Sequence, residues 1–160
     1  MSLWAKHLES TNELMYFDFD VRKKFELAFC TKFGRYVATK YNLLICLDST
    51  HHLFTLVTQN ENHQGVPVAF LLSSDGKTDT IAKFLAAFKK IVLVVGTFMT
   101  DNDVAEMNSI AMTFPESNHL LCYWHILKTW KLKLRITSFD FKKDSQKKTL
   151  MEVDKKYALV

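Results

Sequence analysis

Two aspartates follow apolar segments of the sequence in the same way. Asp48 follows the run 43–47, and Asp101 follows the run 91–99 after a single threonine. A carboxylate is costly inside an apolar core unless it is paired or binds a cation. In open α/β sheets, ligands bind where strands leave the core. The pattern therefore raises the hypothesis that Asp48 and Asp101 meet at one sheet edge and hold a metal ion there.

Both aspartates also have a simpler interpretation. An aspartate just before a helix commonly caps it by accepting hydrogen bonds from the first free backbone N–H groups. On spacing alone, capping is the better interpretation of Asp101, and still more of Asp103, while Asp48 could be a turn residue. The metal hypothesis therefore needs support from the surrounding sequence.

Cys122 and His125 form a second pair with metal-binding chemistry, directly after the short apolar segment 120–121. A structural zinc site takes four such ligands. The other candidates, His51, His52 and His119, form no second pair. We therefore expect Cys122 and His125 to pack and form hydrogen bonds rather than to bind zinc.

The composition is that of a globular protein of one domain. The chain has 160 residues, 48% of them apolar, with 13 phenylalanines. No apolar run approaches the roughly 20 residues of a membrane span, and the start lacks the apolar core of a secretory signal. The three cysteines cannot all pair with one another, so we interpret them as reduced thiols of an intracellular protein.

The positive charge of the chain is concentrated near its C-terminus. Residues 126–160 carry ten Lys and Arg against four Asp and Glu, whereas residues 1–125 carry eleven against thirteen. A basic block can be a footprint for nucleic acid, but it is more often a solvated helix face. On composition alone the second interpretation is preferred.

Apolar patterning and turn residues predict the elements of the fold. Strands are expected at 41–47, 53–58, 66–72, within 92–99, and at 119–122. Helices are expected at 21–39, at 78–90 with Thr78 or Asp79 as cap, at 103–114, and from 124 to about 134. The core-facing residues expected on the last two helices are Val104, Met107, Ala111, Phe114, Ile126, Leu127, Trp130 and Leu134.

Three closely linked strands followed by alternating helices and strands predict an antiparallel meander extended by parallel strands. This is a ribonuclease H-like, mixed five-stranded α/β sheet with helices on both faces, in which the first and fourth strands are neighbours. The predicted division is a helical lead-in at 1–40, an incomplete ribonuclease H-like core at 41–134, and a basic segment at 135–160 that begins a truncated helical insertion.

Residues 25–134 resemble the transposase domain of Mutator-like elements, the MULE family. The resemblance rests on several motifs in the right order, none of which is specific alone. These are Leu44-Ile45-Cys46-Leu47-Asp48-Ser49-Thr50-His51, Gly65-Val66-Pro67-Val68-Ala69-Phe70, Phe98-Met99-Thr100-Asp101-Asn102-Asp103, Phe114-Pro115 and Leu121-Cys122-Tyr123-Trp124-His125.

The resemblance implies DNA cut-and-paste chemistry at an Asp-Asp-Glu site that holds Mg²⁺ or Mn²⁺. It makes Asp48 the first catalytic, metal-binding acid and Asp101 the second, but it leaves Asp103 a capping residue. Cys122 and His125 match the family's Cys-x-x-His signature near the site. The expected partner is the DNA of transposon ends, with no membrane, which implies a nuclear protein.

Two departures from the family pattern shape the functional expectation. The connection 49–52 is short and lacks the residues that tight hairpins prefer, which indicates a small deletion that would disturb the strand register. The third acid of the family follows a long insertion, and Glu152 comes too early to be assigned that role. We therefore expect a fragment that is inactive alone; the alternatives are a domesticated DNA-binding regulator and a decayed remnant.

Overall fold

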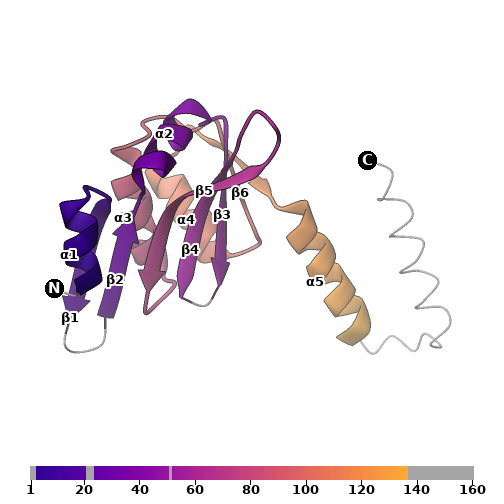
Figure 1. Cartoon of the computed structure of the whole chain (residues 1–160). Helices are drawn as coiled ribbons and strands as arrows, with labels where there is room; N and C mark the ends of the chain where they lie inside the picture. Colours follow the sequence, from indigo (N-terminus) through magenta and orange to yellow (C-terminus); the bar gives the residue numbers. More distant parts are fainter. Residues whose placement is uncertain (1–2, 21–23, 51, 137–160) are drawn as a thin grey trace. The chain divides into compact units, whose positions relative to one another are not determined.

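The computed structural model describes residues 3–20, 24–50 and 52–136, without the side chains of 134–136 (Figure 1). The helices in these ranges are α1 (Leu3–Ser10), α2 (Lys32–Lys40), α3 (Thr78–Lys89), α4 (Val104–Thr113) and α5 (Tyr123–Ile136). The strands are β1 (Leu14–Asp20), β2 (Lys24–Phe29), β3 (Leu44–Thr50), β4 (Leu53–Gln59), β5 (Gly65–Ser73), β6 (Thr97–Thr100) and β7 (Asn118–Leu121). Most of the predicted basic segment, including Glu152, lies outside the described residues.

The strands form one mixed sheet in the order β1-β2-β5-β4-β3-β6-β7. The pairs β3–β4 and β4–β5 are antiparallel, whereas β6 lies parallel to both β3 and β7. All five predicted strands, the antiparallel meander and the contact between the first and fourth of them are confirmed. The sheet has seven strands rather than five, because β1 and β2 extend it beyond β5.

The expectation of one helix over residues 21–39 is wrong in its first part, where β2 runs from residue 24 to 29. Leu27 and Ala28 are neighbours in β2, and both are buried, because α1 packs on one face of the strand and the main core lies on the other. A strand buried on both faces loses strict alternation, so its apolar spacing resembles that of a helix.

The short connection after β3 closes a tight hairpin. The ladder between β3 and β4 runs from Ile45↔Thr58 to Thr50↔Leu53 with no bulge. The predicted disturbance of the register is therefore absent, and the side chain of Asp48 keeps the face that alternation assigns to it. His51, at the tip, lies outside the described residues.

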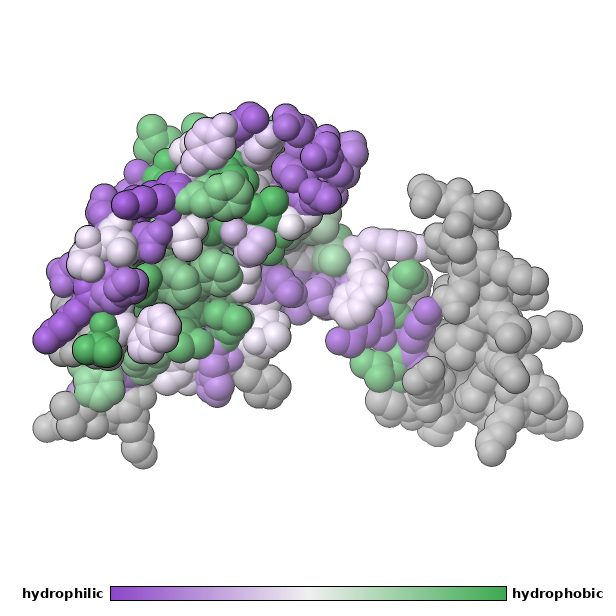
Figure 2. Space-filling view, in the orientation of Figure 1, coloured by the Kyte–Doolittle hydropathy of each residue, from purple (hydrophilic) through white to green (hydrophobic). Residues whose placement is uncertain are grey.

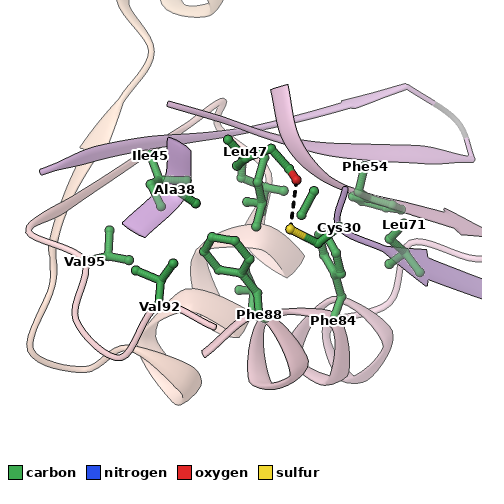
Figure 3. Close-up of a cluster of buried hydrophobic side chains, with 14 of the residues drawn as sticks. Cys30, Ala38, Ile45, Leu47, Phe54, Leu71, Phe84, Phe88, Val92 and Val95 are labelled. Carbon is green, nitrogen blue, oxygen red and sulfur yellow. Dashed lines mark hydrogen bonds between the residues drawn. The ribbon is translucent and has the colours of Figure 1, made fainter. Parts of the chain in front are cut away.

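The main core lies between one face of the sheet and α3 and α4. Figure 3 shows Phe84 and Phe88 of α3 directed toward Leu47, Phe54 and Leu71 of the strands. All five side chains are buried, with exposed fractions of 4% or less. Burying each phenylalanine contributes about 1.5–3 kcal/mol, so this layer holds α3 firmly against the sheet.

The start of α3 differs from the expectation. The helix begins after Lys77, and no side chain caps it. Asp75 instead accepts hydrogen bonds from the Thr80 hydroxyl at 2.7 Å and from the backbone N–H of Lys77 at 3.3 Å. Neither Thr78 nor Asp79 is the cap, because the chain turns into the helix one residue earlier.

The face of α4 that packs against the sheet is not the predicted one. The buried residues of α4 are Glu106, Ser109 and Ile110, whereas Val104 is 63% exposed and Ala111 is exposed. The predicted stripe was chosen to collect the most apolar residues on one side of the helix. The fold instead turns inward the side that carries a carboxyl group.

The opposite face of the sheet is covered less completely. Leu53 and Leu72 form a cross-strand pair on this face and are 38% and 39% exposed. Figure 2 shows apolar residues gathered over the strands on the side turned toward the viewer. Asp48 lies on the same face as Cys46, because side chains alternate along β3.

The chain divides into two compact units, residues 1–122 and 123–160. α5 belongs to the second unit. It exposes more than half the surface of Trp124 and of Trp130, at positions that the sequence predicted to be core. None of the helices in the described part of the chain has the length and apolar character that crossing a bilayer requires.

Candidate metal-binding site

Two neighbouring parallel strands bring Asp48 and Asp101 to the same edge of the sheet. The ladder between β3 and β6 pairs Leu44 with Thr97 and Cys46 with Met99. Asp48 lies two residues after Cys46, and Asp101 lies two residues after Met99. The same register, continued by two residues, therefore places the two carboxylates opposite each other where the strands end.

The two aspartates have different surroundings. Asp48 is exposed and lies opposite Thr55 of β4. Asp101 is half-buried, and its Oδ1 atom is buried without a hydrogen-bond partner among the described residues. A buried carboxylate oxygen without a partner is costly, so this atom is the first structural sign that the site takes a ligand.

Asp103, and not Asp101, caps α4. The Asp103 carboxylate accepts hydrogen bonds from the backbone N–H groups of Ala105 at 2.7 Å and Glu106 at 3.2 Å. The capping role expected for Asp103 is confirmed. Since the cap position is occupied, capping does not explain the buried oxygen of Asp101.

Glu106 is a third carboxylate beside this pair, and the sequence did not identify it. Its side chain is 1% exposed, and neither carboxylate oxygen has a hydrogen-bond partner. Burial raises the pKa of Glu106 from 4.5 to about 8; the Ser49 hydroxyl opposes the rise, and the charges of three aspartates reinforce it. The three are Asp101, Asp103 and Asp48. Glu106 is therefore within electrostatic reach of both predicted site residues.

A signal for Glu106 was present in the sequence. Glu106 lies four residues before Ile110 and eight before Phe114, so the three share one helix face. Ile110 and Phe114 are both buried. A stripe drawn backward from these two residues reaches Glu106, but a search for apolar positions passes over it.

Cys122 is placed beside the predicted site by its backbone. Its N–H donates to the carbonyl of Thr100 at 2.6 Å, which fixes it next to the end of β6. Burial raises the pKa of the Cys46 thiol, and Cys122 and Asp48 raise it further. All three cysteines of the chain are free thiols, as expected.

His125, the other member of the signature, lies on α5 in the second compact unit. Its ring contacts Trp124 edge to face, with the ring centres 4.9 Å apart. Zinc binding by Cys122 and His125 stays an open prediction.

The described residues supply part of a cation site. No three His, Cys, Asp or Glu side chains among them are arranged to hold a metal ion together. Two carboxylates at equivalent strand positions, one with an unpartnered buried oxygen, nevertheless provide the hard oxygen donors that Mg²⁺ and Mn²⁺ prefer. The donor set therefore fits such an ion, although Asp48 and Asp101 alone coordinate it incompletely.

Comparison with known proteins identifies the family. No curated protein matches the chain significantly. The model of the MULE transposase domain matches residues 46–129, more than half of the chain, and the matched segment contains both aspartates, Cys122 and His125. The chain therefore belongs to the MULE transposase domain family.

Proposed function

We propose that this chain carries the metal-binding carboxylates of a transposase that cuts and rejoins DNA phosphodiester bonds. The observation that carries the proposal is the parallel register of β3 and β6, which aligns Asp48 with Asp101 where both strands end. The adjacency of these strands also supports a ribonuclease H-like arrangement for the core. The proposed work on genomic DNA implies a nuclear protein.

In this proposal the two aspartates divide the work. Asp101 is half-buried and anchors the site at the start of α4, whereas Asp48 is exposed and leaves the site open to a DNA phosphate. A divalent ion, when bound, supplies Lewis-acid stabilisation of the phosphodiester oxygens. The positive N-terminus of α4 favours the negative charge gathered there.

The basic C-terminal part of the chain offers the complementary contact with DNA. Residues 126–160 carry an excess of six positive charges, and lysines and arginines bind the phosphate backbone without reading sequence. Such binding weakens steeply as salt is added, because it releases counterions from the DNA. Salt-independent binding of DNA by the full chain would argue against this contact.

Nicking of supercoiled plasmid DNA by the full chain in Mn²⁺ tests the proposal. We expect Mn²⁺-dependent nicking that is lost in Asp48→Asn and in Asp101→Asn. Asp79→Asn, which removes an exposed carboxylate from α3, is the matched control and should nick like the wild type. An absence of nicking by the wild type, or undiminished nicking by Asp101→Asn, would overturn the proposal.

A further inference from the structure

We propose that Glu106 is the third carboxylate of the Asp48–Asp101 site and faces the divalent cation bound there. The inference rests on the proposed function, which assigns the site to a cation. It gives a role to a buried side chain that the fold of α4 otherwise leaves unexplained.

The first argument is the state of the side chain. Glu106 is buried on the inner face of α4, in the layer that also contains Ile110 and Phe114, and both its oxygens lack hydrogen bonds. Buried carboxyl groups in proteins are normally hydrogen-bonded, paired with a cation or metal-bound. The first two solutions are absent here: the strongest charges acting on Glu106 are three carboxylates, and the Ser49 hydroxyl makes no hydrogen bond of normal length with it.

The second argument is the exclusion of a local structural role. A glutamate three residues after an N-cap can accept a hydrogen bond from the backbone N–H of the cap residue and close a capping box. Glu106 has this spacing from Asp103, but neither of its oxygens accepts such a bond. The Asp103 carboxylate alone caps the helix. The side chain of Glu106 therefore does not serve the helix end.

The third argument is position. The residue after Asp48 is Ser49, which is the polar group that lowers the pKa of Glu106, and Asp101 and Asp48 both raise it. Glu106 thus lies beneath the end of β3, next to the two site residues. Asp101 has an unpartnered buried oxygen of its own. A cation at this place would compensate both orphaned groups at once.

The fourth argument concerns chemistry. Two carboxylates hold Mg²⁺ or Mn²⁺ weakly, and affinity rises with the number of charged oxygen ligands. The side chain of Glu106 has three rotatable bonds, so a rotamer change can turn its carboxylate toward the pair without moving α4. The ligand class is a hard divalent cation, because all three donors are carboxylate oxygens.

Titration of the full chain with Mn²⁺, followed by the electron paramagnetic resonance signal of the free ion, tests the inference. We expect Glu106→Gln, which keeps the shape of the side chain, to weaken Mn²⁺ binding by about tenfold or more. Glu116→Gln, a change of an exposed glutamate in the turn after α4, is the matched control and should bind like the wild type. Mn²⁺ should also raise the melting temperature of the wild type more than that of Glu106→Gln.

Glu106→Met provides a second variant that fills the buried site with an apolar side chain. If Glu106→Gln does not fold, Glu106→Met gives the measurement, and we expect the same loss of Mn²⁺ affinity. Wild-type affinity in either folded variant would overturn the inference. Asp101→Asn separates this failure from that of the proposed function: unchanged binding in Asp101→Asn contradicts the metal site itself, whereas lost binding there with normal binding in Glu106→Gln contradicts only the role of Glu106.

Discussion

Asp48 and Asp101 occupy equivalent positions on two neighbouring parallel strands, each two residues after a member of the pair Cys46–Met99. The same relationship brings the N-terminus of α4 to the site, because α4 begins three residues after Asp101. One register thus aligns two carboxylates and places a helix end, with its partial positive charge, beside them.

The buried Glu106 should make the stability of the metal-free protein depend on pH. Its folded-state pKa is raised from 4.5 to about 8 by burial. Between these values the unfolded chain loses a proton that the folded chain keeps, so the free energy of unfolding falls as pH rises, by at most about 1.4 kcal/mol per pH unit. Urea unfolding in EDTA from pH 5 to 8 should show this slope in the wild type.

The slope should largely disappear in Glu106→Gln, since glutamine does not titrate. The variant should also unfold at higher urea than the wild type at pH 8 in EDTA, because it removes an unpaired buried acid. Equal slopes in the two proteins would show that Glu106 is not the group responsible.

Asp103→Ala should separate capping from metal binding. The variant removes the hydrogen bonds to the N–H groups of Ala105 and Glu106 and should destabilise the protein by about 1 kcal/mol. Its Mn²⁺ affinity should stay within about a factor of three of the wild type, since the loss of one nearby charge is largely screened by solvent. A loss as large as that of Asp101→Asn would instead make Asp103 a metal ligand.

The arrangement of the site was predictable from the sequence only where one strong pattern decided it. The apolar runs before Asp48 and Asp101 predicted both strands, and the alternation of helix and strand predicted that the strands pair in parallel. Glu106 was missed because an apolar stripe was sought on α4. The protein buries a carboxyl group there, which an average of hydrophobicity penalises.

The N-terminal part of the fold was predicted less well for a similar reason. β1 and β2 pair with the edge of β5, and this contact joins residues more than 40 positions apart. Phe25 and Phe29 match a helical spacing within their own segment, so local patterning favoured a helix. Only the partner strand shows that the segment is extended.

Lys83→Met should destabilise the N-terminal part of the sheet. The Lys83 ammonium lies 2.8 Å from the carboxylate of Glu26, which is buried, and 2.9 Å from that of Asp18. The variant leaves the buried carboxylate without its cation, and since Lys83 is itself partly exposed we expect a loss of about 1–3 kcal/mol in the free energy of unfolding.

The matched control is Lys90→Met, a change of an exposed lysine at the end of α3. Urea unfolding should show it within about 0.5 kcal/mol of the wild type. Equal effects of the two changes would mean that the contact of Lys83 with Glu26 contributes nothing.

Gly34→Ala should destabilise the contact between α2 and β5. A Cβ atom at position 34 would lie 2.2 Å from the carbonyl oxygen of Val68, which is backbone and cannot move aside cheaply. The expected loss is about 1–3 kcal/mol, larger than the gain from the better helix propensity of alanine. Gly65→Ala, where the nearest atom is a side-chain methyl of Val57 at 3.3 Å, is the comparison and should cost less. Thermal melts that rank the two changes in the opposite order would refute the close approach.

The most direct test of the shared site is a double-mutant cycle of Mn²⁺ affinity with Asp48→Asn, Asp101→Asn and the double variant, all in the full chain. If the two carboxylates hold one cation, each single change should weaken binding by about tenfold or more, and the double variant should bind scarcely more weakly than the worse single one. Losses that simply add, or a single variant that binds Mn²⁺ like the wild type, would contradict a shared site.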